Sequence, residues 1–380
     1  MERRNFLRVA VVGSTAAAFG GASWLSAFSA SAKPADGPYG PLQPPDANGL
    51  ALPKDFTGRI IAKTGEKVGN SAYTWHPAPD GGACFADGDG WIYVSNSEVS
   101  STGGVGAVRF GADGSIVDAY RTLEGTDVNC AGGATPWNTW LSCEEVDKGE
   151  VYETDPWGKK EPIVRPAMGK FKHEACAVDT DRKTVYMTED VPDGGFYRFT
   201  PSAWPDLGAG KLEIMIGAAD QTSGAVTWKE VPDPSAGSEA TRYQVDGSKP
   251  FNGGEGCYYA ANTCWFTTKG DNRVWAYDAA NSSISLTYDE SDPLKGVDNV
   301  TRAGSGDLFV AEDGGNLEIC LITPDGVVAP FVRVDGHDES EITGPAFSPD
   351  GKRLYFSSQR GTSGSSSGGY TFEVTGPFRA

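Results

Sequence analysis

The chain has 380 residues and a formal net charge of −19, because 51 acidic residues outnumber 32 basic ones. This charge repels nucleic acid and anionic membrane surfaces, so we expect neither as a partner. After the N-terminal segment no stretch approaches the roughly 18 apolar residues of a membrane span, and we expect no stable membrane insertion of the mature chain.

The first 32 residues have the pattern of an export signal peptide. Arg3 and Arg4 precede an apolar run of small residues, which ends in a small-residue cleavage site at Ala30-Ser31-Ala32. Paired arginines are typical of substrates of the twin-arginine export machinery, which predicts a periplasmic or secreted protein. An ordinary Sec signal or a membrane anchor is the alternative. Residues 33–50 are rich in Pro and Gly and predict a linker, so residues 51–380 would form the folded domain.

One strand pattern, aromatic-apolar-small-polar, recurs six times along this domain. The copies begin at Tyr93, Trp140, Tyr186, Trp265, Phe309 and Tyr355. Four of the five spacings lie near the period of about 40–45 residues that a four-stranded propeller blade has. The longer spacing, between Tyr186 and Trp265, contains an expected insertion at about 201–249.

A second strand precedes each copy and would line the central channel of a propeller. These earlier strands lie near Asp80, Asn129, His173, Gly254, Asp298 and Thr343. Six such pairs predict an all-β fold, a six-bladed β-propeller with metal sites in its central channel. The segment 370–374 would close the ring by pairing with residues 58–61.

Such a ring brings polar side chains from every blade to one end of the channel. The earlier strands offer Asn129, Glu174, Glu255 and Asn299, and the later strands offer Asn96, Cys143, Glu189 and Glu312, followed by Glu98, Glu144, Asp190 and Asp313. Carboxylates packed around a narrow channel raise one another's pKa, so metal cations are expected to compensate them. The oxygen ligands favour calcium, and the thiol of Cys143 favours an additional transition metal.

Other chemistries have less support in the sequence. Only three histidines are present, which disfavours a zinc site built from histidines, and no nucleophile elbow, P-loop or dinucleotide motif occurs. Seven cysteines cannot all pair within the chain. Cys84, Cys176 and Cys257 are interpreted as small buried residues. Arg360 follows the last strand copy and would either meet an anion at the channel mouth or lie on the surface.

Several motifs occur in a recognisable order. They are Asn129-Cys-Ala-Gly-Gly133, Thr139-Trp-Leu-Ser-Cys-Glu-Glu145, His173-Glu-Ala175, Tyr186-Met-Thr-Glu-Asp190 and Thr343-Gly-Pro-Ala-Phe347. In these motifs the chain resembles the PhoX family of bacterial alkaline phosphatases over nearly all of residues 70–375. The resemblance implies a six-bladed propeller that holds two ferric ions and calcium ions and hydrolyses small-molecule phosphate monoesters outside the cytoplasm.

Carried over by position, the resemblance implies roles for individual residues. Cys143 would be a thiolate ligand of iron, Glu174 and Glu255 would be carboxylate ligands, Glu98, Glu144, Glu189 and Glu312 would bind or support calcium, and Asn129 would lie near the substrate phosphate. The chain departs from the family at Gly253, where longer members carry an arginine, and at Ser97, where the family motif has a histidine. Metals or Arg360 would therefore have to neutralise the negative charge of the phosphate.

The leading hypothesis is an exported phosphatase that depends on ferric iron and calcium. Two alternatives stay open. One is a calcium-dependent propeller hydrolase, of phytase or lactonase type, that is indifferent to Cys143. The other is a non-catalytic propeller whose metals are structural and whose loops bind a partner.

Overall fold

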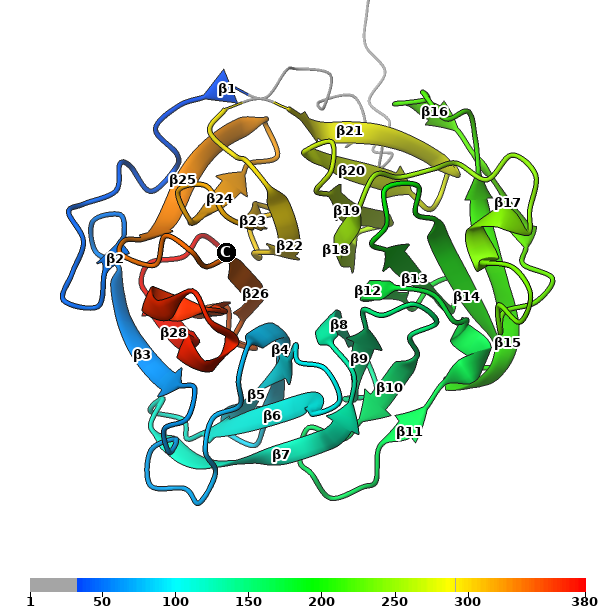
Figure 1. Cartoon of the computed structure of the whole chain (residues 1–380). Helices are drawn as coiled ribbons and strands as arrows, with labels where there is room; N and C mark the ends of the chain where they lie inside the picture. The colour runs from blue at the N-terminus through cyan, green and yellow to red at the C-terminus, as the bar shows by residue number, and fades with distance from the viewer. Residues whose placement is uncertain (1–32, 291) are drawn as a thin grey trace, which may run out of the picture.

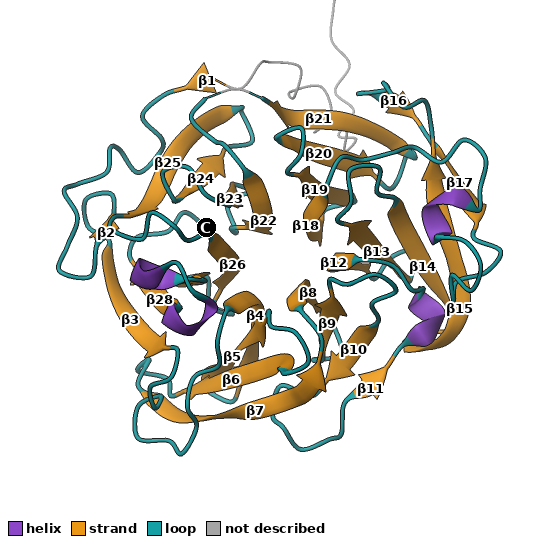
Figure 2. Cartoon of the chain, in the orientation of Figure 1, coloured by secondary structure: helices purple, strands orange, loops and turns teal. Residues whose placement is uncertain are grey.

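The computed structural model describes residues 33–290 and 292–380, which form six sheets arranged as a closed ring around a central channel (Figure 1). The predicted all-β, six-bladed propeller is confirmed. Helix in the described residues is limited to short 3-10 turns at Pro166–Met168, Thr241–Tyr243, Gly361–Ser363 and Ser366–Gly368 (Figure 2). None of the described helices has the length and apolar character that crossing a bilayer requires. The expected export signal, residues 1–32, lies outside the described residues.

In each blade the three strands nearest the channel run outward in chain order. The first blade contains β4 (Pro79–Asp87), β5 (Gly90–Ser97), β6 (Gly103–Phe110) and β7 (Ile116–Thr126). The second contains β8 (Asn129–Ala134), β9 (Trp140–Glu144), β10 (Val151–Thr154) and β11 (Ile163–Val164). The third contains β12 (His173–Asp179), β13 (Thr184–Glu189), β14 (Phe196–Ala203), β15 (Asp206–Ile216) and β17 (Thr227–Glu230).

The remaining blades follow the same plan. The fourth contains β18 (Gly254–Ala260), β19 (Thr263–Thr268), β20 (Arg273–Asp278), β21 (Ser283–Asp289) and β16 (Gly224–Ala225). The fifth contains β22 (Val297–Arg302), β23 (Leu308–Glu312), β24 (Glu318–Ile322), β25 (Val327–Val334), β1 (Lys33–Pro34) and β2 (Leu50–Ala51). The sixth contains β26 (Ile342–Phe347), β27 (Arg353–Ser358), β28 (Tyr370–Thr375) and β3 (Thr57–Lys63).

The ring closes within the sixth blade, where β28 pairs antiparallel with β3. Tyr370 lies opposite Lys63 and Val374 lies opposite Gly58, so the predicted closure between the two ends of the domain is confirmed. Because the ring is closed, every blade has a neighbouring blade on each side, which a linear array of blades would not provide.

Two segments differ from their sequence-based descriptions. The stretch 33–50, predicted as a linker, lies along the fifth blade: β1 and β2 pair with β25, and the ring of Tyr39 packs against Phe56 and Phe331. The insertion predicted at about 201–249 starts later, because β15 is the regular fourth strand of the third blade. Residues 217–253 form the excursion, which adds β17 to the third blade and β16 to the fourth.

The core consists of apolar side chains packed between adjacent blades. Along β27, Leu354 and Phe356 point into the cluster shared with the fifth blade, whereas Tyr355 between them stacks on Tyr93 of the first blade at 5.0 Å. This alternation is the period of two that a strand imposes, and it lets one strand serve two interfaces. Phe372 of the closing strand is fully buried in the same cluster as Phe356.

Phe372→Ala is expected to lower the free energy of unfolding by about 3–5 kcal/mol, because it leaves a cavity at the ring closure. Val117→Ala is the control, since that side chain is 59% exposed on the outer strand β7 and its truncation should cost little. Urea unfolding followed by tryptophan fluorescence measures both. Equal stabilities of the two variants would contradict a packed closure.

Candidate metal centre

Every blade delivers two side chains to the same end of the channel. The start of each inner strand pairs with the end of the second strand, and an irregularity in the register follows in each blade. We call the residue after the start of each inner strand the first channel position. From the first blade to the sixth it is Asp80, Cys130, Glu174, Glu255, Asp298 and Thr343. The residue after the end of the second strand, here the second channel position, is Glu98, Glu145, Asp190, Lys269, Asp313 or Gln359.

In five of the six blades a glycine or alanine follows the first channel position, because the inner strands approach one another closely there; the fifth blade has Asn299. A Cβ on Gly81 would lie 2.4 Å from the Cα of Ala131, and a Cβ on Gly256 would lie 2.6 Å from the Cα of Asn299. No side chain fits at such distances. The glycines therefore allow neighbouring blades to bring their first channel positions together.

Eight of the twelve channel positions, together with Glu341, form interlocking groups in which the ligand atoms of each group lie within 4.8 Å of one another. The groups are Asp80, Glu98 and Cys130; Cys130, Glu145 and Glu174; Glu174, Glu255 and Asp298; and Asp298, Asp313 and Glu341. Cys130, Glu174 and Asp298 each belong to two groups, so the set forms one continuous chain of ligand atoms. We call the members of these groups the channel acids, with Cys130 as their single thiol.

Burial and mutual repulsion disfavour the charged forms of these groups. Burial raises the pKa of Glu174 well above its ordinary value, and the charge of Glu255 raises it further. Burial likewise raises the pKa of Glu145 to about 8 and that of Asp298 to about 7. The thiol of Cys130 has its pKa raised by burial and then by nearby carboxylates. Without added cations, these groups would hold protons that an exposed carboxylate releases.

Three basic side chains neutralise part of the set. The Lys269 ammonium lies 2.8 Å from Glu255 Oε1, 3.2 Å from Asp313 Oδ2 and 3.9 Å from Asp298 Oδ2. Its pKa is lowered by burial but raised more strongly by these carboxylates. Lysine thus compensates the side of the channel formed by the fourth and fifth blades.

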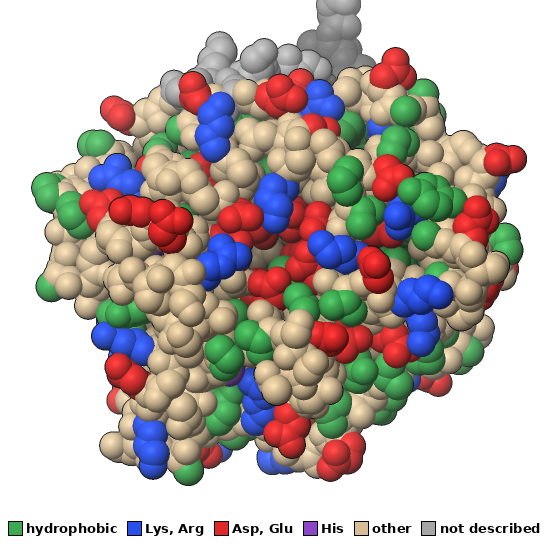
Figure 3. All heavy atoms as spheres, viewed as in Figure 1, with side chains coloured by type: hydrophobic (Ala, Val, Ile, Leu, Met, Phe, Trp, Pro, Cys, Tyr) green, Lys and Arg blue, Asp and Glu red, His purple; other side chains and the backbone are tan. Residues whose placement is uncertain are grey.

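The other two cations lie at the edge of the set. Lys172 pairs with Glu145 at 2.8 Å, and Arg360 pairs with Glu341 at 2.8 Å. Figure 3 shows acidic side chains gathered at the centre of this face, with basic side chains among them. Asp80, Glu98 and Glu174 form no ion pair within residues 33–290 and 292–380, and they surround Cys130.

Glu98, Glu174 and Glu255, which the sequence predicted as site residues, all lie among the channel acids. Arg360 reaches their edge through an ion pair with Glu341, and whether it meets an anion there stays a prediction. Asn129 does not reach the channel with its side chain. Its amide accepts from Thr126 Oγ1 at 2.5 Å and donates to Ser142 Oγ at 3.0 Å inside the second blade.

Cys143 is not among the channel acids, in contrast to the sequence-based interpretation. It lies on the same face of β9 as Leu141, in an apolar cluster between the second and third blades, and its Sγ is 3.3 Å from that of Cys176. Residues two apart on a strand share a face, so a thiol two residues after a buried leucine is buried with it. The thiol in the channel belongs to Cys130 instead.

Glu144, Glu189 and Glu312 fix loops and are not among the channel acids. Glu312 belongs to a separate buried group with Glu318 and Cys320, whose ligand atoms also lie within 4.8 Å of one another. Glu144 accepts backbone N–H groups of Asp127 and Glu150, at 2.9 and 3.1 Å, and Glu312 accepts those of Lys295 and Glu318, at 2.7 and 3.1 Å. Glu189 accepts from Tyr197 Oη at 2.7 Å and pairs with Arg242 at 2.8 Å. The residue that follows each of them, at the second channel position, faces the channel.

Sequence reasoning therefore missed several channel acids. The prediction chose Glu144 instead of Glu145. It treated Asp80 and Cys130 only as parts of a strand motif, and it did not consider Lys269 or Glu341. One signal could have found Asp80 and Cys130: aligning the six blades on their inner strands places an acid or the thiol at the first channel position of five blades.

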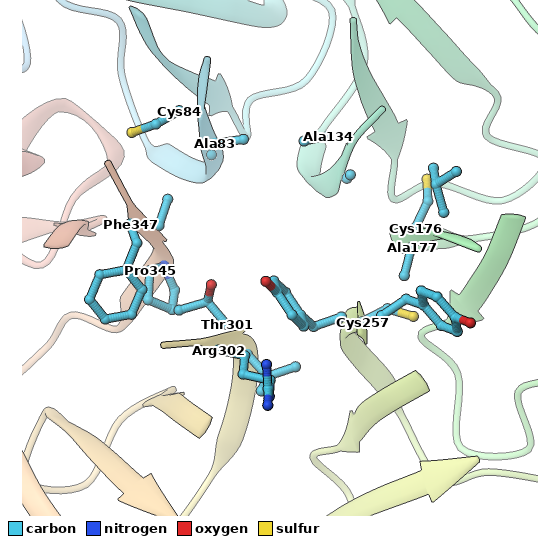
Figure 4. Close-up of a pocket in the computed structure, with 18 of the residues that line it drawn as sticks. Ala83, Cys84, Ala134, Cys176, Ala177, Cys257, Thr301, Arg302, Pro345 and Phe347 are labelled. Atoms are coloured by element: carbon cyan, nitrogen blue, oxygen red, sulfur yellow. The ribbon is translucent and has the colours of Figure 1, made fainter. Parts of the chain in front are cut away.

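The opposite end of the channel has a different character. There the later residues of the inner strands surround a cavity of about 310 Å³, lined by small, apolar and aromatic side chains together with Thr301 and Arg302 (Figure 4). Cys84, Cys176 and Cys257 line it. Cys176 and Cys257 are buried, as expected, whereas Cys84 is only partly buried. No Asp or Glu is among its lining residues in the described structure, so the carboxylates of the channel acids lie at the other end.

The residues present fit a metal cluster. The buried oxygen Glu174 Oε2 has no hydrogen-bond partner, although such an atom is costly to leave unpaired. It faces a set in which Asp80, Glu98 and Cys130 also lack a cation. Carboxylate oxygens with one thiol suit a hard ion beside a transition metal.

Comparison with known proteins agrees with this arrangement. The sequence profile of the family described as alkaline phosphatase PhoX matches residues 96–283 and 260–361. No curated protein sequence matches the chain. Among solved structures, PhoX of Pseudomonas fluorescens in complex with vanadate, a transition state analogue, has a TM-score of 0.73 at 16% identity, covering 88% of this chain and 97% of that chain.

Two further solved structures share the propeller architecture more loosely. A gluconolactonase of Xanthomonas campestris has a TM-score of 0.50 at 14% identity, covering 90% of this chain and 98% of that chain. A protein of unknown function from Bacteroides thetaiotaomicron has a TM-score of 0.53 at 10% identity, covering 88% and 83%. At these identities the likenesses show the fold alone, whereas the family profile covers most of the sequence. The chain therefore belongs to the PhoX family of alkaline phosphatases.

Proposed function

We propose that the protein is an exported, metal-dependent phosphatase that hydrolyses phosphate monoesters with iron and calcium bound by the channel acids. The observation that carries the proposal is the group of Asp80, Glu98, Cys130, Glu145 and Glu174, in which buried carboxylates meet a thiol and are only partly compensated by Lys172. A soft thiolate ligand beside hard oxygen ligands favours a transition metal together with calcium. Family membership supports phosphate ester hydrolysis as the reaction.

Cys130 takes the place of Cys143 as the proposed thiolate ligand. Its neighbours raise the pKa of its thiol, so the thiolate forms only where a cation offsets them. Bound iron and calcium would supply Lewis acidity and positive charge toward the phosphoryl oxygens. Arg360, 37% exposed at the edge of the set, is the proposed contact for a phosphate oxygen that faces solvent.

The proposal includes export through the twin-arginine machinery to the periplasm or medium. That machinery carries folded proteins, so the metals would be bound before export. Protein that is expressed with its own signal peptide and purified from the exported fraction therefore keeps its native metals for analysis. Iron and calcium content is then measured by elemental analysis, and hydrolysis is measured with p-nitrophenyl phosphate. Calcium without iron, with activity on a lactone only, would refute the proposal in favour of a calcium-dependent propeller hydrolase.

The variants Cys130→Ser and Cys143→Ser form a matched pair. Cys130→Ser is expected to lose most bound iron and at least about tenfold in hydrolysis, because the hydroxyl is a poor substitute for a thiolate ligand. Cys143→Ser should keep its iron and activity and lose only stability, since a hydroxyl replaces a thiol in an apolar cluster. Iron analysis and steady-state kinetics measure both variants. The opposite pattern would return the thiolate role to Cys143.

A further inference from the structure

Lys269 breaks the pattern of the second channel position. In the other five blades this position holds Glu98, Glu145, Asp190, Asp313 or Gln359, so the fourth blade alone contributes a positive charge to it. The backbone fixes the location of Lys269, because its N–H donates to Gly253 O at 2.8 Å and the next N–H donates to Asn252 O at 2.9 Å.

The ammonium of Lys269 occupies the middle of a carboxylate set. Its three partners come from three different elements: Glu255 from β18, Asp298 from β22 and Asp313 from the residue after β23. Glu255 and Asp298 are almost fully buried. Carboxylate oxygens that converge on one cation are the kind of ligand that a calcium ion takes in proteins, at shorter distances of about 2.3–2.6 Å.

The two sides of the channel therefore differ in their built-in charge. On the side of Cys130, Asp80, Glu98 and Glu174 have no basic partner among the described residues, and Lys172 pairs there with Glu145 and Asp190, each at 2.8 Å. On the side of Lys269, one ammonium serves three carboxylates. Metal ions are needed on the first side, whereas on the second the protein supplies the cation itself.

We infer that Lys269 takes the place of a divalent cation between Glu255, Asp298 and Asp313, and that it confines metal binding to the Cys130 side of the channel. The inference rests on the proposed function, because it presumes that the channel acids bind metal. Removal of the ammonium leaves three carboxylates facing an uncharged space. That space suits a hard cation with oxygen ligands, which makes calcium the expected occupant.

The experiment compares four purified proteins: wild type, Lys269→Ala, Lys269→Gln and Lys269→Arg. Each is equilibrated with calcium and freed of excess, and bound calcium per chain is measured by elemental analysis. The alanine and glutamine variants should each bind one calcium ion more than wild type, and the arginine variant, which keeps the charge, should match wild type. The glutamine variant keeps the test decisive if the alanine variant does not fold.

Asp313→Asn supplies a second, independent measurement. In wild type it should leave the calcium content unchanged, because Lys269 already serves that carboxylate. Combined with Lys269→Ala it should abolish the additional ion. A loss of calcium from the single Asp313→Asn variant would overturn the inference.

The outcomes separate this inference from the proposed function. An equal, non-zero calcium content in all four proteins overturns the role of Lys269 and leaves the phosphatase proposal standing. An absence of bound metal in every protein overturns both. An additional ion in the alanine and glutamine variants of a protein that hydrolyses no phosphate ester supports the role of Lys269 and refutes the proposed activity.

Discussion

Glu174→Gln is expected to lower phosphate ester hydrolysis by at least about 10²-fold and to reduce the bound iron and calcium. Glu174 is fully buried and belongs to the group of Cys130 as well as to that of Glu255 and Asp298. Glutamine keeps the shape of the side chain and can still accept from Asn299 Nδ2, which lies 3.3 Å from Glu174 Oε1. The substitution therefore removes the charge with little change in packing.

Two measurements distinguish lost metal binding from misfolding. In chelator, Glu174→Gln should melt at a higher temperature than wild type, since it relieves repulsion between buried carboxylates. With metal present, it should gain less stability than wild type. The control is Glu144→Gln, a buried carboxylate in the neighbouring blade whose oxygens accept only backbone N–H groups. Glu144→Gln should keep its metal, and an equal loss of metal from both variants would contradict the assignment.

After removal of the metals, the stability of the protein is expected to fall as pH rises from about 4 to about 8. The folded-state pKa of Glu145 is raised to about 8 and that of Asp298 to about 7, both above the values of an unfolded chain. The folded state then binds more protons than the unfolded state between about pH 4 and pH 8, so stability falls as pH rises through this range. The metal-free protein should melt on the order of 5 °C higher at pH 5.5 than at pH 8.

Buried histidines act in the opposite direction and need a control. Burial lowers the pKa of His76, and it lowers that of His173 to about 4, so both favour folding at higher pH. The contribution of these histidines to stability cancels when the melting temperature without calcium is subtracted from that with calcium. This difference, measured by differential scanning calorimetry, should grow as pH rises from 5.5 to 8. A constant difference would show that the channel acids do not bind calcium.

The architecture could be predicted because each blade repeats one pattern. The aromatic residues that begin the later strands, such as Tyr93 and Tyr355, recur at the blade period, and these two stack in the structure. The closing pair of β28 and β3 followed from the same count of strands. Regular spacing and alternation are local properties that a sequence displays directly.

The site could be predicted only in part because it depends on which residues of each strand face the channel. The register of every inner strand shifts just after its first channel position, and a shift of one residue exchanges the faces of a strand. The prediction therefore took Cys143 and Glu144 where the structure has Cys130 and Glu145. Glu174 and Glu255 lie among the channel acids as expected, because each is the only carboxylate in its motif, His173-Glu-Ala175 or Gly254-Glu-Gly256. The role of Lys269 could not be predicted, because it depends on contacts between two blades.

The pairing of β28 with β3 also sets the order of events during synthesis. During synthesis β28 follows all six inner strands, whereas its partner β3 precedes them. The channel acids come from the first five blades and from Glu341, which directly precedes β26, so a chain that ends before Glu341 cannot present the full set to a metal ion. Metal uptake would then report that the blades up to the start of the sixth have come together. A cell that exports only metal-loaded molecules would thereby retain truncated or misfolded chains.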